Sequence, residues 1–257
     1  MDRTFASIIY AGGLFVGMLA LLELGRRIGR RRQAKDEERA RAGLGAVEGA
    51  VFALMGLLIA FTFSGAASRF DARRQLIVEE ANSIGTAWLR LDLLPAAAQP
   101  ELRDLFRRYV DLRLAVYEKL PDLAAALADL DKANTLQGVI WSRAVAAFQQ
   151  SPTPVVAQLI PALNQMFDIA ATRTAAARMH PPPIIFVLLG VLALMSSLLA
   201  GYAMAGGKAR SWIHMVGFAL IMATTVYVIL DLEFPQLGII RIDAFDQVLV
   251  ELRQTMR

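Results

Sequence analysis

Four long runs without a charged residue constrain this 257-residue sequence more than any other feature. They cover residues 5–22, 49–68, 181–207 and 211–230. A helix needs about 20 apolar residues to cross a hydrocarbon core of roughly 30 Å, so each run is long enough to span a bilayer. Continuous runs exclude an ordinary soluble enzyme, and they exclude an outer-membrane barrel, whose strands alternate apolar and polar residues. The sequence therefore predicts a multi-pass membrane protein with four transmembrane helices.

A polar segment of residues 69–180 separates the second and third runs. Its apolar residues recur at helical spacing and no strand pattern is evident, so the fold class that we expect is all-α. From Arg69 to Leu94 only Gly85 interrupts good helix-forming sequence, which predicts that the second span continues beyond the bilayer until Pro95. We divide the chain into spans 1 and 2 (1–68), an extramembrane helical domain (69–180), spans 3 and 4 (181–232) and a C-terminal tail (233–257).

Basic residues gather in the loop between the first two spans and in the short loop after the third span. They are Arg26, Arg27, Arg30, Arg31, Arg32, Lys35, Arg39, Arg41, Lys208 and Arg210. Short loops rich in Lys and Arg remain in the cytoplasm, which predicts that the helical domain and both termini lie outside. Because the loop adjoins a membrane span, its charge does not indicate nucleic-acid binding.

Catalytic and metal-binding patterns are missing from the sequence. There is no cysteine, and the two histidines, His180 and His214, lack the spacing of paired metal ligands. Neither a nucleophile-elbow motif nor a phosphate-binding glycine loop occurs. We therefore predict a protein that is not an enzyme and that needs no metal or cofactor.

Charged residues beside the spans are the first group of candidate functional residues, because a charge is costly in lipid. Glu48 lies one turn into the second span, where it either reaches the interface or serves as a proton site. Asp231 and Glu233 end the fourth span. They form either a solvated helix end or part of a polar belt with basic partners, which are Arg69, Arg73, Arg74 and Arg241.

A row of residues at four-residue spacing runs along the second span: Gly49, Ala53, Leu57 and Phe61. Such spacing places all four on one side of a helix. The small residues are typical of close helix packing in membranes. Alternatively, the larger ones face the axis of an oligomer, where apolar rings gate a pore by excluding water. The row alone does not decide between packing and a gate.

Several segments resemble the bacterial bestrophin-like domain membrane proteins, a family without an assigned activity. They are residues 45–51 (GAVEGAV), 58–74 (LIAFTFSGAASRFDARR), 79–95 (EEANSIGTAWLRLDLLP), 227–241 (YVILDLEFPQLGIIR) and 243–247 (DAFDQ). A more distant resemblance links the chain to bestrophins, which are pentameric anion channels. The residues that carry it are Phe61, Arg69, Phe70, Ala72 and Arg73.

The resemblance to bestrophins implies a homo-oligomeric channel, with a pentamer favoured, that passes small anions across the bilayer of a bacterial inner membrane. By position, Phe61, Leu57 and Ala53 would form the apolar neck, and alanine would make a wider ring than a bulky residue. The arginines Arg69, Arg73 and Arg74 would attract anions. The acidic run that binds calcium in animal bestrophins is absent. Bestrophins keep their helical domain in the cytosol, which is opposite to the orientation that the basic loops predict.

Two other functions remain open from the sequence. One is a non-conducting membrane scaffold or sensor whose helical domain, residues 69–180, binds a partner. The other is a proton-driven membrane element that uses Glu48. Chloride flux through purified protein would distinguish the channel from both.

Overall fold

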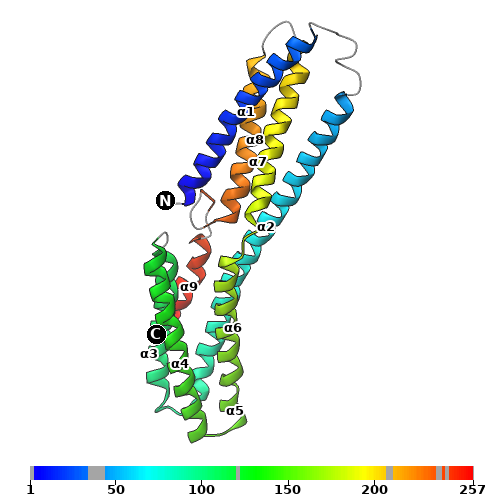
Figure 1. The fold of residues 1–257 in the computed structure, drawn as a ribbon. Helices are drawn as coiled ribbons and strands as arrows, with labels where there is room; N and C mark the ends of the chain where they lie inside the picture. The colour runs from blue at the N-terminus through cyan, green and yellow to red at the C-terminus, as the bar shows by residue number, and fades with distance from the viewer. Residues whose placement is uncertain are drawn as a thin grey trace. The chain divides into compact units, whose positions relative to one another are not determined.

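The computed structural model describes residues 3–33, 44–119, 122–206, 211–235, 239–240 and 243–256. Within these ranges the chain is helical and has no strand (Figure 1). Four helical stretches are long and apolar enough to cross a membrane. The predicted all-α fold with four spans is therefore confirmed.

The helices follow one another in a simple order. They are α1 (Arg3–Gln33), α2 (Leu44–Arg90), the 3₁₀ helix η1 (Leu91–Leu93), α3 (Gln99–Glu118), α4 (Leu123–Gln150), α5 (Pro154–Ala157), α6 (Leu159–Arg178), α7 (Pro183–Ala203), the 3₁₀ helix η2 (Met204–Gly206), α8 (Trp212–Glu233) and α9 (Asp243–Thr255).

The second span continues well past its apolar run, because α2 contains 47 residues. It ends in η1, and Leu94 then adopts an extended backbone with φ −77° and ψ 156°. The ring of a proline disfavours helical geometry in the residue before it, so Pro95 explains where the helix stops.

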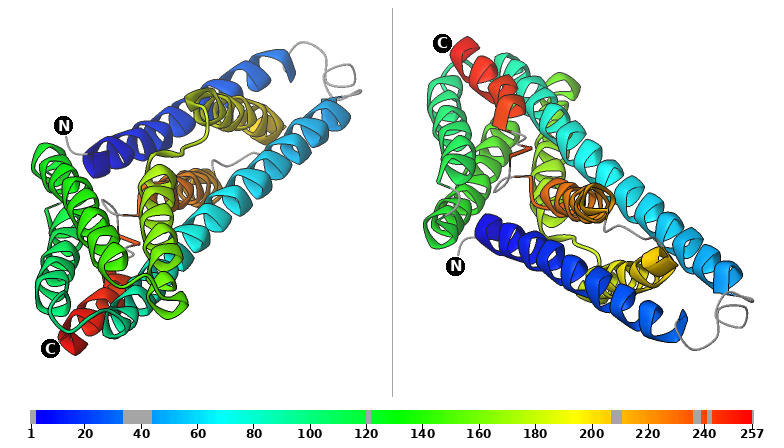
Figure 2. Two further views of the ribbon diagram at one scale, coloured as in Figure 1. Left: turned by 90° about the horizontal axis from the view of Figure 1, so that it is seen from below. Right: turned by 90° about the horizontal axis from the view of Figure 1, so that it is seen from above.

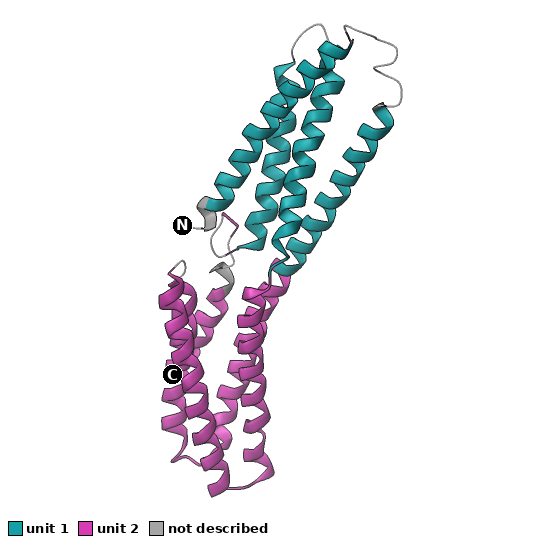
Figure 3. Cartoon of the chain, in the orientation of Figure 1, with its two compact units in different colours: residues 1–69, 180–234 teal, residues 70–179, 235–257 magenta. Residues whose placement is uncertain are grey.

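The described chain forms two compact units (Figure 3). The membrane unit comprises residues 1–69 and 180–234, and the helical unit comprises residues 70–179 and 235–257. The α2 helix contributes its first part to the membrane unit and its second part to the helical unit.

In the membrane unit, α1 lies beside α7 and α8 (Figures 1 and 2). Two glycines bring α1 and α7 into backbone contact. A Cβ atom on Gly25 would collide with the carbonyl of Leu198, and one on Gly201 would collide with the carbonyl of Leu22. Small residues allow helices to approach closely in lipid, where contact between backbones replaces the burial of large side chains.

The helical unit has a conventional apolar core, to which α2, α3, α4, α6 and α9 contribute. Phe106, Ile140 and Leu163 are fully buried there, as is Leu249 from the C-terminal segment. The helix α9 was not predicted from the sequence, although Val248, Leu249, Leu252 and Met256 recur at helical spacing. The segment that we treated as a tail is thus part of the core of this unit.

Candidate functional site

One side of α2 is uncovered along the membrane span. Gly49, Ala53, Leu57 and Phe61 are all exposed, with Leu57 at 52% and Phe61 at 68% of full exposure. A Cβ atom on Gly49 would meet nothing within 4 Å among the described residues. We call these four residues the α2 face. They lie together as predicted, and the described part of the chain does not use them for packing.

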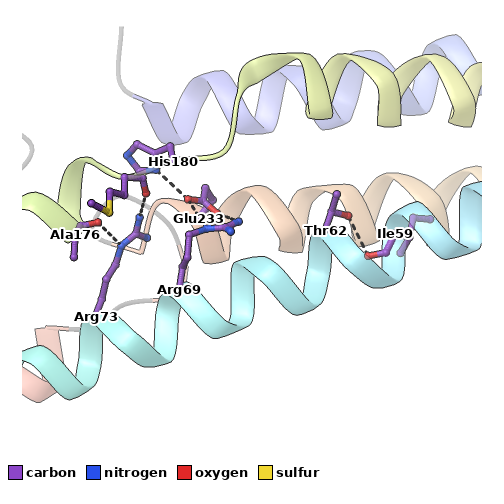
Figure 4. Close-up of polar contacts among 8 residues, drawn as sticks. Ile59, Thr62, Arg69, Arg73, Ala176, His180 and Glu233 are labelled. Atoms are coloured by element: carbon purple, nitrogen blue, oxygen red, sulfur yellow. Dashed lines mark hydrogen bonds and ion pairs between the residues drawn. The ribbon is translucent and has the colours of Figure 1, made fainter.

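The other side of the same helix turns inward. Met55 and Ala66 are buried, and Phe52 makes an edge-on contact with Phe218 of α8 at 6.3 Å between ring centroids. The hydroxyl of Thr62 donates to the carbonyls of Leu58 and Ile59 (Figure 4). The helix itself therefore satisfies this hydroxyl, which leaves no unsatisfied donor of Thr62 beside the α2 face.

A buried carboxylate closes the end of α8. Glu233 is completely buried, and Arg69 of α2 donates to it through Nε at 2.9 Å and Nη2 at 2.7 Å (Figure 4). His180, just before α7, lies with Nδ1 3.1 Å from Glu233 Oε1, and its ring lies 4.5 Å from that of Phe234. Sequence reasoning named Arg69 and Glu233 but missed the contact of His180, whose position directly before the run of prolines 181–183 was the available signal.

The other belt candidates have different surroundings. In the helical unit, Arg73 donates to the carbonyls of Ala176 and Met179 at the end of α6, at 3.2 and 2.9 Å. Arg74 forms a local ion pair with Asp71 at 3.1 Å.

The remaining two belt candidates belong to the end of the fourth span and the segment after it. Asp231 is buried and accepts a hydrogen bond from Tyr227 at 3.3 Å. Arg241 lies outside the described residues.

Glu48 is half-buried in the second turn of α2. Among the residues that the structure describes, none forms an ion pair with it. The described contacts of Glu48 therefore do not add support to its suggested role as a proton site.

A cluster of charges that the sequence did not reveal lies inside the helical unit. Glu80 of α2 is completely buried and accepts from Arg113 Nε at 2.6 Å and from Arg173 Nη1 at 2.8 Å. Arg173 also pairs with Asp246 of α9 and lies 3.7 Å from the ring centroid of Tyr117. No spacing rule links side chains from four helices, so only the folded structure brings this cluster together.

Burial and charge act against each other in this cluster. Burial opposes ionisation of Glu80, but the positive charges of Arg113 and Arg173 outweigh it, and the pKa of Glu80 lies below its ordinary value. Burial raises the pKa of the nearby Tyr109 to about 12. The positive charges of the two arginines equal the negative charges of the two carboxylates. This neutral, internally paired arrangement indicates that the cluster has a structural role.

Within the described ranges, no three His, Asp or Glu side chains are arranged to hold a metal ion.

The sequence matches the Bestrophin-like domain family over residues 12–244. This chain belongs to that family. The match confirms the resemblance seen in the segments of α2 and α8.

Solved structures with the same fold support the assignment of this bestrophin-like chain. A single-substitution variant of a bacterial bestrophin homologue from Klebsiella pneumoniae is 14% identical, with 94% of this chain and 96% of that chain covered and a TM-score of 0.71. The homologue solved by zinc phasing is 14% identical over 94% and 97%, with a TM-score of 0.70. No curated protein matched the sequence. The bestrophin-like chain is therefore a membrane protein with a bestrophin fold.

Proposed function

We propose that this protein is an oligomeric anion channel of the bacterial inner membrane, with α2 lining the pore. The observation that carries the proposal is the uncovered α2 face, where Leu57 and Phe61 stand more than half exposed, whereas Met55 and Ala66 on the other side of the span are buried. Membership of the bestrophin-like family also supports the proposal of a membrane channel.

Copies of the chain around a common axis would place Ala53, Leu57 and Phe61 in three successive rings. Narrow apolar rings stop ion flow by excluding water, and they need no charged gate. The ring of Ala53 would be the widest, so Leu57 and Phe61 carry the gate. A pentamer is the arrangement that the likeness to bestrophins favours.

The contacts of the arginines favour the structural alternative for the polar belt. Arg69 is engaged by the buried Glu233, and Arg74 by Asp71. The proposed preference for anions thus rests on the likeness to the bestrophin anion channels and not on the contacts of these arginines.

Chloride flux into liposomes tests the channel. Leu57→Ala and Phe61→Ala widen the rings and are expected to increase flux several-fold over the unchanged protein. Phe63→Ala is the matched control, because Phe63 is 44% exposed and lies on another side of α2. A folded oligomer that passes no chloride, before and after these substitutions, would contradict the channel and favour a scaffold or sensor.

We further propose that the helical unit lies outside the bilayer and that the basic end of α1 faces the cytoplasm. A reporter that is active only in the periplasm, fused after Arg257, is then expected to be active. A reporter that is active only in the cytoplasm would report the reverse orientation.

A further inference from the structure

A small cavity, open on one side, lies along the basic end of α1 in the membrane unit. Its volume is about 300 Å³, and its described lining consists of Glu23, Arg26, Arg27 and Arg30. Arg26, Arg27 and Arg30 lie three, four and seven residues after Glu23, so the four residues share one side of the helix. The cavity is thus a concave site with three guanidinium groups and one carboxylate.

The charge in this lining favours an anion. Three arginines and one glutamate give the lining a net charge of +2. Arg27 Nε lies 2.9 Å from Glu23 Oε1, so the carboxylate is already engaged by one of the three. Arg26 is only 4% exposed although it is charged, which places one guanidinium deep beside the cavity. Guanidinium groups bind phosphate oxygens through paired hydrogen bonds.

A second observation points to a lipid as the source of the phosphate. Ile9, Val16 and Ala20 form an exposed apolar stripe along the side of α1 that carries Glu23 and Arg27, with Ile9 at 49% and Val16 at 64% exposure. An acyl chain that lies along this stripe brings its headgroup to the level of Arg27 and Arg30. Basic pockets beside transmembrane helices hold anionic headgroups by this combination of contacts.

We propose that the cavity at the basic end of α1 binds the phosphate group of an anionic phospholipid. This site does not depend on ion conduction, because its ligand, its helix and its readout differ from those of the α2 face. It gives the arginines of α1 a binding role in addition to their effect on orientation.

Lipid-dependent stability tests the site in the full-length protein in detergent. Phosphatidylglycerol is expected to raise the melting temperature more than phosphatidylcholine does. Arg30→Gln is expected to weaken the affinity for phosphatidylglycerol about fivefold, as one basic residue near a membrane surface does. Arg32→Gln is the matched control, because it removes the same charge from an exposed position outside the cavity.

Three results would overturn the proposal. Inorganic phosphate that stabilises the protein as strongly as phosphatidylglycerol would show a free-anion site instead of a lipid site. An equal loss of affinity in Arg30→Gln and Arg32→Gln would show general attraction to negative lipids. A loss of stability in Arg26→Gln and Arg30→Gln that is the same with both lipids would show that the guanidinium groups serve only contacts within the protein.

Discussion

The membrane unit and the helical unit are both built from helices, but different contacts hold them. In the membrane unit, α1 and α7 touch through Gly25 and Gly201, with backbone against backbone. In the helical unit, large side chains such as Phe106 fill a core that also encloses Glu80 and its arginines. Lipid offers helices no hydrophobic gain on association, whereas water does. Helix packing therefore depends on close contact between backbones in the membrane unit and on the burial of large apolar side chains in the helical unit.

Removal of the central charge of the helical unit should have the largest effect. Glu80→Gln leaves Arg113 and Arg173 buried without their shared carboxylate, which costs about 3–5 kcal/mol. Trp88 packs in this core, so its fluorescence during chemical denaturation measures the loss. Glu79→Gln, at an adjacent half-buried position, is the control. Equal stabilities of the two variants would show that the cluster contributes little.

Acid should remove the same charge gradually. Because the pKa of folded Glu80 is held below its ordinary value of 4.5, its contribution is complete above that pH and is lost as the pH falls below it. The helical unit should therefore lose stability in this range. Chemical denaturation at a series of pH values gives the free energy of unfolding as a function of pH. In this acid range, that free energy should fall less steeply with decreasing pH for Glu80→Gln than for the unchanged protein. Identical slopes would assign the acid sensitivity to other groups.

A single methyl group should disturb the membrane unit. Gly201→Ala pushes a Cβ atom into the carbonyl of Leu22, and such overpacking costs about 3 kcal/mol. The melting temperature in detergent checks this. In Gly13→Ala the new Cβ atom meets no neighbour within 4 Å, so this control should be neutral or slightly stabilising. A tolerated Gly201→Ala would mean that α1 and α7 can separate without cost.

Removal of the ion pair between Arg69 and Glu233 in the membrane unit should give the next largest loss of stability. Arg69→Gln leaves the buried Glu233 without the hydrogen bonds that the guanidinium donates to it, which costs about 2 kcal/mol. Arg74→Gln removes a local ion pair with Asp71 whose side chains are both exposed, and it should cost less than about 0.5 kcal/mol. Thermal stability and chloride flux are measured together. Reduced flux at unchanged stability would instead make Arg69 an anion-attracting residue.

The smallest effect should come from the surface of the helical unit. Arg253 of α9 forms a two-point ion pair with Asp111 of α3, at 2.7 and 3.0 Å, and both side chains are partly exposed. Arg253→Gln should cost less than about 1 kcal/mol, and the cost should shrink at high salt. Arg253→Lys keeps the charge and serves as the control. A large effect that does not depend on salt would show that this pair organises α9.

Hydropathy and proline positions were enough to predict the four spans and the extension of α2. Those signals are local, because each depends on residues that are neighbours in the sequence. The predicted row from Gly49 to Phe61 was also local, since one helix carries all of it. Its function remains a prediction, because exposure on one chain does not reveal what covers that face.

The features that the sequence did not predict depend on distant residues. Glu80 meets Arg113, Arg173 and Asp246 only after four helices have packed. His180 joins Glu233 across 53 residues of sequence. The helix α9 is the exception, because its apolar spacing was visible but was treated as a tail.

The place of α9 in the core has a consequence for biosynthesis. Leu249 and Met256 are buried with residues of α2 to α6, yet they leave the ribosome after α7 and α8. The helical unit is therefore discontinuous in the chain, and its core stays incomplete until the last two spans have been made and inserted. Until that moment the unfilled side of the nascent domain is open to chaperones and proteases. The core of the helical unit can therefore be completed only after α7 and α8 have been synthesised.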